Sequence, residues 1–486
     1  MSKNDTTTKL APDLEISKIV TGLWQIADME REGQKLDPDQ AAQHMQAYTD
    51  AGLTTFDLAD HYGSAEDIAG IFTSRYAKDD NVQVLTKWVP EPGKNDKYSV
   101  KEAIQRSLDR LKTDTIDLLQ YHAWNYADPS YLDDLFHLQE CQEEGLIRHL
   151  GLTNFDTAHL NIVIETGIEV ICNQISFSLL DQRAMNGMTR LCEEKGVRIL
   201  AFGTLAGGFL TERWLDQPEP KEKDLETWSQ MKYRRYISEA GGWEKFQNLL
   251  KTLKQVADQH NVSIANVAIR YILDQPGVGA AIIGARLGER EHIENNQTLL
   301  NFASGEKDRE AIGEAIDDLI PIPGDCGDEY RKPPFLTASG DLSHHVDKLP
   351  PSYPTKTGAD GRTLALSGTV WEDIAGFSRA VSKGDRILVS GTTATHGERV
   401  IGGNDPAAQT HFVIDKIEGA IQSLGGRLED VVRTRVYVSN ADHWEPISRA
   451  HGQRFGNIQP ANTLVQAGLI GPEYLVEVDA EATQKS

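Results

Sequence analysis

The chain has 486 residues, more than one hydrophobic core usually organises, so its length predicts at least two domains. Hydrophobic residues at 39% and charged residues at 25% are ordinary for a globular protein, and no apolar run is long enough to cross a bilayer. The formal net charge of −24 argues against nucleic acid as the main partner, because phosphate binding needs clustered Lys and Arg. Four cysteines without a C-x-x-C pair, and an N-terminus without a secretory signal, predict a cytoplasmic protein with reduced thiols.

From about residue 17 to residue 300, short apolar runs alternate with longer amphipathic stretches. Eight runs have a strand pattern, at 19–22, 54–58, 82–85, 116–119, 149–152, 170–172, 198–201 and 280–283. Helical periodicity is clear between several of them, at 39–51, 100–111, 132–144 and 243–260. Eight strands that alternate with helices predict an α/β fold, a (β/α)8 TIM barrel, rather than an open sheet.

The pattern changes after the predicted barrel. Pro and Gly interrupt any periodicity over 336–361, which predicts a linker or extended arm between a first domain at 1–335 and a second at 362–486. His344 and His345 lie in this linker, where adjacent histidines are usually solvated, so no metal site is expected.

In the second domain, strand patterns at 386–390, 431–438 and 474–479 are separated by helical patterns at 406–424 and 443–455. This pattern predicts a small α+β domain with one sheet and its helices on one face.

Functional groups of a barrel are expected where its strands end, and three predicted strands end there in Asp57, Lys87 and His122. Tyr62 follows in the loop after Asp57.

Hydride addition to a carbonyl leaves negative charge on oxygen, so it needs a proton donor and a nearby positive charge. A tyrosine is a weak acid at neutral pH, and we expect Lys87 to lower its pKa while Asp57 keeps the lysine charged. A histidine can hydrogen-bond the substrate oxygen and orient it. The four residues together predict carbonyl reduction.

Three motifs carry a family resemblance: TFDLADHYG at 55–63, LTKW at 85–88 and DLLQYH at 117–122. They resemble the aldo-keto reductase family over about residues 15–330. The resemblance implies a complete catalytic tetrad of Asp57, Tyr62, Lys87 and His122. It also implies reversible, NAD(P)H-dependent reduction of an aldehyde, ketone or sugar-like carbonyl. Trp24, Trp88, Trp124 and the segment 211–242 are expected to form pocket walls and a lid, with core packing as the alternative for each tryptophan.

No G-x-G-x-x-G follows the first strand, and the chain has no G-x-x-x-x-G-K-[ST] motif, so a cofactor must bind by other means. In the resembled family a nicotinamide cofactor lies across the barrel mouth. GLTNF at 151–155, NQ at 173–174, FGTLAGGFL at 202–210 and IGAR at 283–286 resemble the segments that bind its carboxamide, ring, pyrophosphate and adenosine end. The cofactor-binding residues predicted in this way are Gly22, Trp24, Thr153, Asn154, Gln174, Phe202, Gly203, Thr204, Leu205, Gly207, Arg286, Arg290 and Asn296. Arginine can fork onto a 2′-phosphate, which favours NADP(H), with NAD(H) as the alternative.

The second domain has its own resemblance, carried by ILVSGT at 387–392, LEDVVRT at 428–434, QPANT at 459–463 and LVEVDA at 475–480. These motifs resemble the YjgF/YER057c/UK114 (RidA) family, which implies a chorismate-mutase-like fold and a homotrimer. Family members that deaminate enamines or imines carry an arginine where this chain has Asn462, and an amide cannot form a bidentate cationic clamp. Glu477 matches the family's acidic position. We therefore expect a different ligand or a structural role for this domain.

Two other functions stay open from the sequence. Some barrel relatives bind nicotinamide mainly to regulate a partner, so a nicotinamide-sensing scaffold is one alternative. A bifunctional enzyme, whose C-terminal domain hydrolyses an imine or enamine related to the barrel's substrate, is the other.

Overall fold

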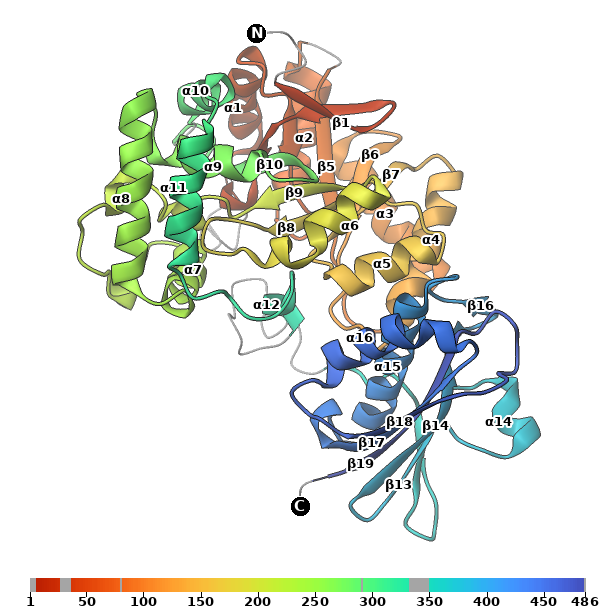
Figure 1. Ribbon diagram of the computed structural model, residues 1–486. Coiled ribbons are helices and arrows are strands. Elements are labelled where there is room, and N and C mark those ends of the chain that lie inside the picture. The colour runs from red at the N-terminus through yellow and green to blue at the C-terminus, as the bar shows by residue number, and fades with distance from the viewer. Residues whose placement is uncertain (1–5, 27–35, 79–80, 290–291, 332–348, 485–486) are drawn as a thin grey trace.

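The computed structural model describes residues 6–26, 36–78, 81–289, 292–331 and 349–484. The chain folds into a barrel surrounded by helices, followed by a smaller domain with one large sheet (Figure 1). His344 and His345 lie outside the described residues. Within the described ranges, no three His, Cys, Asp or Glu side chains are grouped to hold a metal ion. No helix of the described chain has both the length and the apolar character needed to span a bilayer.

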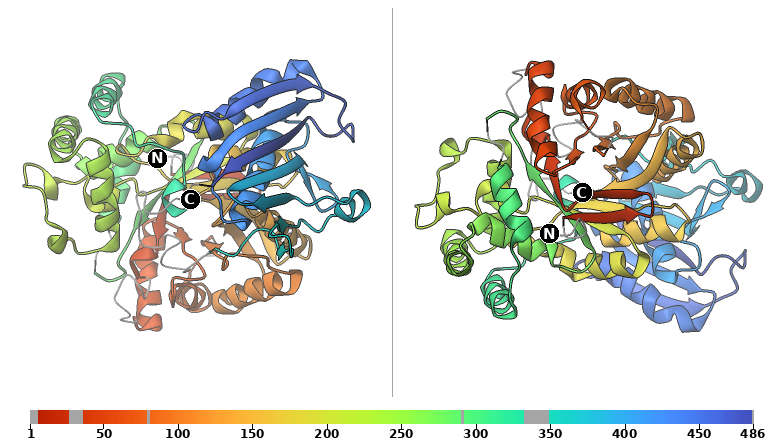
Figure 2. Two further views of the ribbon diagram at one scale, coloured as in Figure 1. Left: turned by 90° about the horizontal axis from the view of Figure 1, so that it is seen from below. Right: turned by 90° about the horizontal axis from the view of Figure 1, so that it is seen from above.

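Eight parallel strands close the barrel, which confirms the predicted (β/α)8 fold. They are β3 (Ile19–Gly22), β4 (Thr55–Asp57), β5 (Gln83–Trp88), β6 (Ile116–Tyr121), β7 (Ile147–Thr153), β8 (Cys172–Ser176), β9 (Arg198–Phe202) and β10 (Val278–Gly284). Only the first residue of β8 falls within the predicted run at 170–172, because Asn173, Gln174 and Ser176 interrupt the apolar pattern although they are buried. A hairpin of β1 (Thr7–Ala11) and β2 (Leu14–Ser17) lies across the N-terminal end of the barrel, as the view from above in Figure 2 shows.

The helices bury one apolar side each and expose the other. Around the barrel they are α1 (Pro38–Asp50), α2 (Ala65–Ile71), α3 (Lys97–Leu111), α4 (Ser130–Glu143), α5 (Thr157–Glu165), α6 (Met188–Lys195), α7 (Trp228–Glu239), α8 (Trp243–His260), α9 (Ile264–Leu273), α10 (Ile293–Asn301), α11 (Glu306–Asp317) and the short α12 (Asp328–Arg331). Local sequence fixes their starts: Asp96 and Ser99 form a capping box at α3, and Asp156 caps α5 by accepting from the backbone N–H of His159. The four helices predicted from periodicity correspond to α1, α3, α4 and α8.

The C-terminal domain is built on one seven-stranded sheet with the order β11-β12-β13-β14-β19-β17-β18. Its strands are β11 (Thr355–Thr357), β12 (Thr363–Ala365), β13 (Ala380–Lys383), β14 (Arg386–Thr393), β17 (Val431–Val438), β18 (Ala461–Gln466) and β19 (Val476–Thr483). The helices α15 (Pro406–Ser423) and α16 (Trp444–Phe455) pack together, and α15 contacts β14 and β19. The predicted α+β architecture is confirmed. The sheet begins earlier than predicted, because β11 lies inside the range assigned to the linker and pairs with β12.

The two domains meet where α15 packs against α5 of the barrel (Figure 1). The buried His159 of α5 joins them, because its Nδ1 lies 2.7 Å from Asp156 Oδ1 and its Nε2 lies 2.9 Å from Asp415 Oδ2 of α15. The two carboxylates outweigh the effect of burial and raise the pKa of His159 to about 9. The positive charge of His159 lowers the pKa values of both Asp156 and Asp415. Arg454 lowers the pKa of Asp415 as well. The interface therefore contains a buried imidazolium between two carboxylates.

This arrangement predicts a pH-dependent contribution to stability. The folded pKa of His159, about 9, lies above its ordinary value of 6.5, so the stabilisation is complete below pH 6.5 and is lost as the pH rises through about 9. The loss amounts to at most about 3 kcal/mol. We expect the difference in urea unfolding midpoint between the wild type and His159→Gln to be largest near pH 6.5 and to shrink towards pH 9. A difference that stays constant over this range would contradict the assignment.

Candidate active site

Four predicted catalytic side chains meet at the C-terminal end of the barrel. Asp57 is the last residue of β4, Lys87 is next to last in β5, and His122 follows β6 directly. Tyr62 lies in the turn between β4 and α2. Parallel pairing of β4, β5 and β6 brings the three strand ends side by side. The four side chains line one common cavity of about 570 Å³, a volume suited to a small-molecule or cofactor site.

A buried ion pair lies at the centre of this group. Lys87 Nζ donates to Asp57 Oδ2 at 2.6 Å and to the carbonyl oxygen of Leu58 at 2.7 Å. The other carboxylate oxygen of Asp57 accepts from Gln174 Nε2 at 2.7 Å and from Gln120 Nε2 at 3.1 Å. Burial lowers the pKa of Lys87, and the opposing attraction of Asp57 offsets only part of that effect. Both partners are thus hydrogen-bonded, which is the condition for holding charges inside a protein.

Tyr62 lies beside this pair, with Lys87 Nζ 5.4 Å from the centre of its ring. The expectation of a lowered pKa for Tyr62 is wrong, because the net shift is upward. Burial raises the pKa of Tyr62 well above its ordinary value, and the negative charge of Asp57 raises it further, as do Tyr330 and Asp60. The phenol is therefore neutral at physiological pH. That is the form in which a tyrosine can donate a proton.

His122 is held by ring contacts and by a long hydrogen bond. Its Nδ1 lies 3.3 Å from the carbonyl oxygen of Thr153, so Nδ1 carries the hydrogen of that pair. The ring packs edge-on against Trp124 at 4.4 Å and lies 5.8 Å from the ring of Tyr330. These contacts fix the ring orientation, and His122 lies at the wall of the same cavity as Tyr62.

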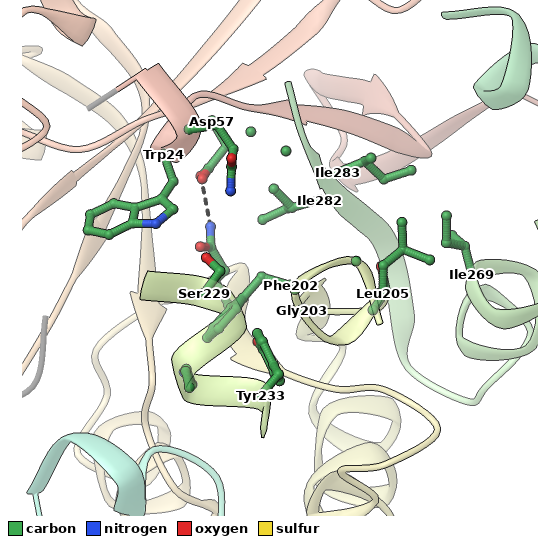
Figure 3. A pocket seen from close by; sticks show the side chains of 18 of the residues that line it. Trp24, Asp57, Phe202, Gly203, Leu205, Ser229, Tyr233, Ile269, Ile282 and Ile283 are labelled. Atoms are coloured by element: carbon green, nitrogen blue, oxygen red, sulfur yellow. Dashed lines mark hydrogen bonds between the residues drawn. The ribbon is translucent and has the colours of Figure 1, made fainter. Parts of the chain in front are cut away.

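The cavity extends from the four residues towards β10 and α10, between Ile282 and Ile283 on one side and Phe202, Gly203 and Leu205 on the other (Figure 3). The predicted cofactor-binding residues that line it are Gly22, Trp24, Thr153, Asn154, Gln174, Phe202, Gly203, Thr204, Leu205, Gly207, Arg286 and Asn296. Arg290 lies outside the described residues.

Three features of the cavity fit a nicotinamide cofactor. Asn154 has the left-handed backbone angle φ of 60°, and its buried Oδ1 has no hydrogen-bond partner among the described residues. Such an oxygen can accept from the amide of a carboxamide. Phe202 presents an aromatic ring to the cavity. A Cβ at Gly203 would overlap the hydroxyl of Tyr233, so only glycine allows the backbone to lie there.

The residues next to the cavity include several that the sequence did not reveal. Lys232 of α7 is buried, donates to Tyr330 Oη at 3.0 Å and lies 5.3 Å from the centre of the Phe202 ring. Tyr330 belongs to α12, which is anchored by a buried ion pair of 2.9 Å between Arg183 and Glu329. Lys232 lies in the segment 211–242 that was predicted to form the pocket wall, but its burial could not be seen from its neighbours in the sequence.

Two of the three tryptophans predicted as pocket walls line the cavity, Trp24 and Trp124. Trp88 does not. It is buried in the main hydrophobic core and packs at 5.7 Å against Tyr121, because its position in β5 turns it away from the neighbouring Lys87. The expectation of Trp88 as a pocket wall is therefore wrong.

The C-terminal domain presents a different set of polar side chains. Asn462 of β18 donates to Thr434 Oγ1 at 2.9 Å, so its amide is engaged within the sheet. Glu477 of β19 lies against Gly391, where a Cβ would overlap its carboxylate. Burial raises the pKa of Glu477, and the nearby Arg379, which donates to Gly391 and Thr392, opposes that rise. Arg379 is a buried cation near the acidic position that the sequence did not single out.

A closed parallel barrel with a buried lysine–aspartate pair and a tyrosine at the mouth of a cofactor-sized cavity defines an enzyme of the TIM-barrel class. Comparisons with known proteins agree. The model of the aldo/keto reductase family matches residues 18–317, and the chain belongs to that family. The Endoribonuclease L-PSP model, that of the YjgF family, matches residues 369–484.

Individual relatives match the two parts separately. The chain is 25% identical to the aldo-keto reductase YhdN of Bacillus subtilis over 335 residues, which cover 66% of this chain and 96% of the relative. Its C-terminal part is 40% identical over 117 residues to the uncharacterized protein SCO2049 of Streptomyces coelicolor, covering 24% of this chain and 87% of that protein. The solved structure of the glycerol dehydrogenase AKR11B4 from Gluconobacter oxydans superposes with a TM-score of 0.55 at 23% identity, over 67% of this chain and 98% of the other, and shows the shared barrel fold.

Proposed function

We propose that this oxidoreductase reversibly reduces an aldehyde, ketone or sugar-like carbonyl with NADP(H), and that Tyr62 is its proton donor. The observation that carries the proposal is the buried Lys87–Asp57 ion pair beside a neutral Tyr62. A bound nicotinamide supplies hydride to the carbonyl carbon. The protein must then protonate the carbonyl oxygen and stabilise the charge that develops on it.

Each member of the group has a distinct role in this chemistry. Tyr62 gives its phenolic proton to the carbonyl oxygen, and the resulting phenolate is stabilised by the ammonium of Lys87. Asp57 keeps that ammonium charged and fixed, because its carboxylate accepts from Lys87 at 2.6 Å. His122 orients the substrate oxygen. Trp124 and Tyr330, which also line the cavity, limit the access of water to the reacting atoms.

The cofactor is proposed to lie along the cavity between β10 and the segment 202–210. Thr153, Asn154 and Gln174 would hold the carboxamide. Because Gln174 Nε2 already donates to Asp57 at 2.7 Å, its carbonyl oxygen is the atom left for the cofactor. Phe202 would stack on the nicotinamide ring. Arg286 follows β10 and lines the cavity, with its Nε donating to Gln25 Oε1 at 3.3 Å, and its guanidinium would bind a 2′-phosphate.

The proton-donor role predicts the behaviour of Tyr62→Phe. Removing the hydroxyl should lower kcat for carbonyl reduction by about 10²- to 10⁴-fold, the usual contribution of a positioned general acid. The dissociation constant for NADPH should change by no more than about twofold, since the ring is retained. Steady-state kinetics and a fluorescence titration of the same preparation measure the two quantities. Unchanged turnover would remove the mechanism.

The cofactor preference is tested at Arg286. Losing charged hydrogen bonds to a phosphate costs about 2 kcal/mol, so Arg286→Ala should weaken NADPH binding roughly 30-fold. NADH lacks the 2′-phosphate, and its dissociation constant should change little. Titrations of both cofactors against the wild type and the variant decide the point. Equal losses for NADPH and NADH would contradict the assignment of Arg286 to the phosphate.

For the C-terminal domain we propose a structural role as the trimerisation module of the chain. The exposed apolar side chains of its sheet support this role: Leu388 of β14 is 40% exposed, Val432 of β17 is 50% exposed and Val465 of β18 is 44% exposed. Exposed apolar groups gathered on one sheet are typical of an interaction surface. The amide at Asn462 in place of a cation argues against the usual deaminase chemistry.

The trimer predicts a change of mass on disrupting this surface. Light scattering after size-exclusion chromatography should give about three times the chain mass for the wild type. The double variant Leu388→Glu with Val432→Glu should shift it to the monomer mass, because buried carboxylates would be left without partners. A monomeric wild type would contradict the proposal.

A further inference from the structure

The contact between the two domains continues into the barrel as an unbroken series of packed polar groups. It starts at Asp415 of α15, which is buried and bound by both Arg454 of α16 and His159 of the barrel helix α5. Both ring nitrogens of His159 face carboxylates, so both carry hydrogens and the ring is an imidazolium. Its orientation is therefore set jointly by Asp156 of the barrel and Asp415 of the C-terminal domain.

The imidazolium of His159 lies flat on the ring of Tyr126. The ring centroids are 3.4 Å apart and the interplanar angle is 7°. The guanidinium carbon of Arg331 lies 4.2 Å from the centre of the same Tyr126 ring. Because His159 covers one face, Arg331 occupies the other, and Tyr126 is held between two cations. A displacement of His159 would thus be transmitted to Arg331 through the ring of Tyr126.

Arg331 in turn fixes the backbone of the cavity wall. Its Nη1 donates to the carbonyl oxygen of Asn154 at 2.5 Å, and its Nε donates to the carbonyl oxygen of Ala123 at 2.9 Å. Asn154 has a positive φ of 60°, in the left-handed region that asparagine adopts more readily than most non-glycine residues. The backbone N–H of Asn154 donates to Gln174 at 2.8 Å, so both of its peptide groups are held. Arg331 is the contact that links Asn154 to the domain interface.

We infer that Asp415 is a positioning residue for the carboxamide end of the cofactor site, acting through His159, Tyr126 and Arg331 on Asn154. The inference rests on the role proposed above for Asn154. It gives the C-terminal domain a part in the barrel's reaction although none of the domain's described residues lines the cavity. Docking of α15 on α5 then sets the affinity of the barrel for nicotinamide cofactors.

The structure offers a matched control for this inference. A second histidine–aspartate pair joins the domains, with His396 Nε2 of the C-terminal domain 2.8 Å from Asp133 Oδ1 of α4. Asp133 has no described contact with Tyr126, Arg331 or Asn154. Both pairs connect the two domains. The pair at His159 is the one of the two whose described contacts continue, through Tyr126 and Arg331, to the cavity wall.

The test compares Asp415→Asn with His396→Gln in the full-length protein, by titration with NADPH and with NADH. Asp415→Asn should weaken both cofactors by about 3- to 30-fold, while kcat at saturating cofactor stays within about twofold. His396→Gln should leave both dissociation constants near the wild-type values. Wild-type affinity in Asp415→Asn would overturn the inference. Equal weakening by both variants would also overturn it, because it would indicate a general loosening of the interface.

A double-mutant cycle separates this inference from the proposed role of Asn154. Asn154→Ala should weaken cofactor binding by itself, and adding Asp415→Asn should then have little further effect, because both act on one contact. If Asn154→Ala binds cofactor like the wild type, the carboxamide assignment fails. If the losses of cofactor-binding free energy in the two single variants add up in the double variant, the role of Asp415 is contradicted and the assignment of Asn154 to the carboxamide stands. Should Asp415→Asn unfold, as judged by thermal melting, Arg331→Gln interrupts the same path inside the barrel and replaces it in the comparison.

Discussion

The buried ion pair of Lys87 and Asp57 is the interaction on which the active site depends. Two opposite charges inside a barrel are stable only when all their hydrogen-bonding groups are engaged, and losing one partner of such a pair costs about 3 to 5 kcal/mol. Here the partners come from separate strands, with Gln120 and Gln174 completing the bonds of Asp57. The chemistry therefore requires the closed barrel. Tyr62 lies beside the same pair, where burial first and the negative charge of Asp57 second raise its pKa and keep the phenol neutral.

The barrel and the central part of the site could be predicted from the sequence because their signals are local. Each strand except β8 is a short apolar run, and the four central residues occur in compact motifs. Other features depend on contacts between distant segments. Lys232 and Tyr330 are 98 residues apart and meet only after α12 folds back to the cavity. Trp88 and Lys87 are neighbours in the chain but face opposite sides of one strand. The pKa of Tyr62 depends on burial, which no sequence pattern reports.

The presence of two domains in one chain has a structural explanation. The C-terminal domain is packed against the barrel, because α15 contacts α5 and Asp415 of α15 binds the buried imidazolium of His159. Apolar side chains of both domains belong to one continuous buried cluster, and the directional bonds of His159 add a polar contact of specified geometry to this packing. Domain docking, the orientation of His159 and the backbone of Asn154 are connected by one continuous set of contacts. We propose that the smaller domain supports the site and also offers a surface for assembly.

We propose that Tyr62, beside the Lys87–Asp57 pair, makes this barrel a carbonyl reductase rather than a sensor of nicotinamide. The most direct measurement follows the absorbance of NADPH, and of NADH, when the full-length protein is mixed with a panel of aldehydes, ketones and sugars. A carbonyl reductase would oxidise NADPH continuously and form an equal amount of alcohol. Tight binding of the cofactor with no oxidation across the whole panel would contradict this proposal and would favour a sensing scaffold.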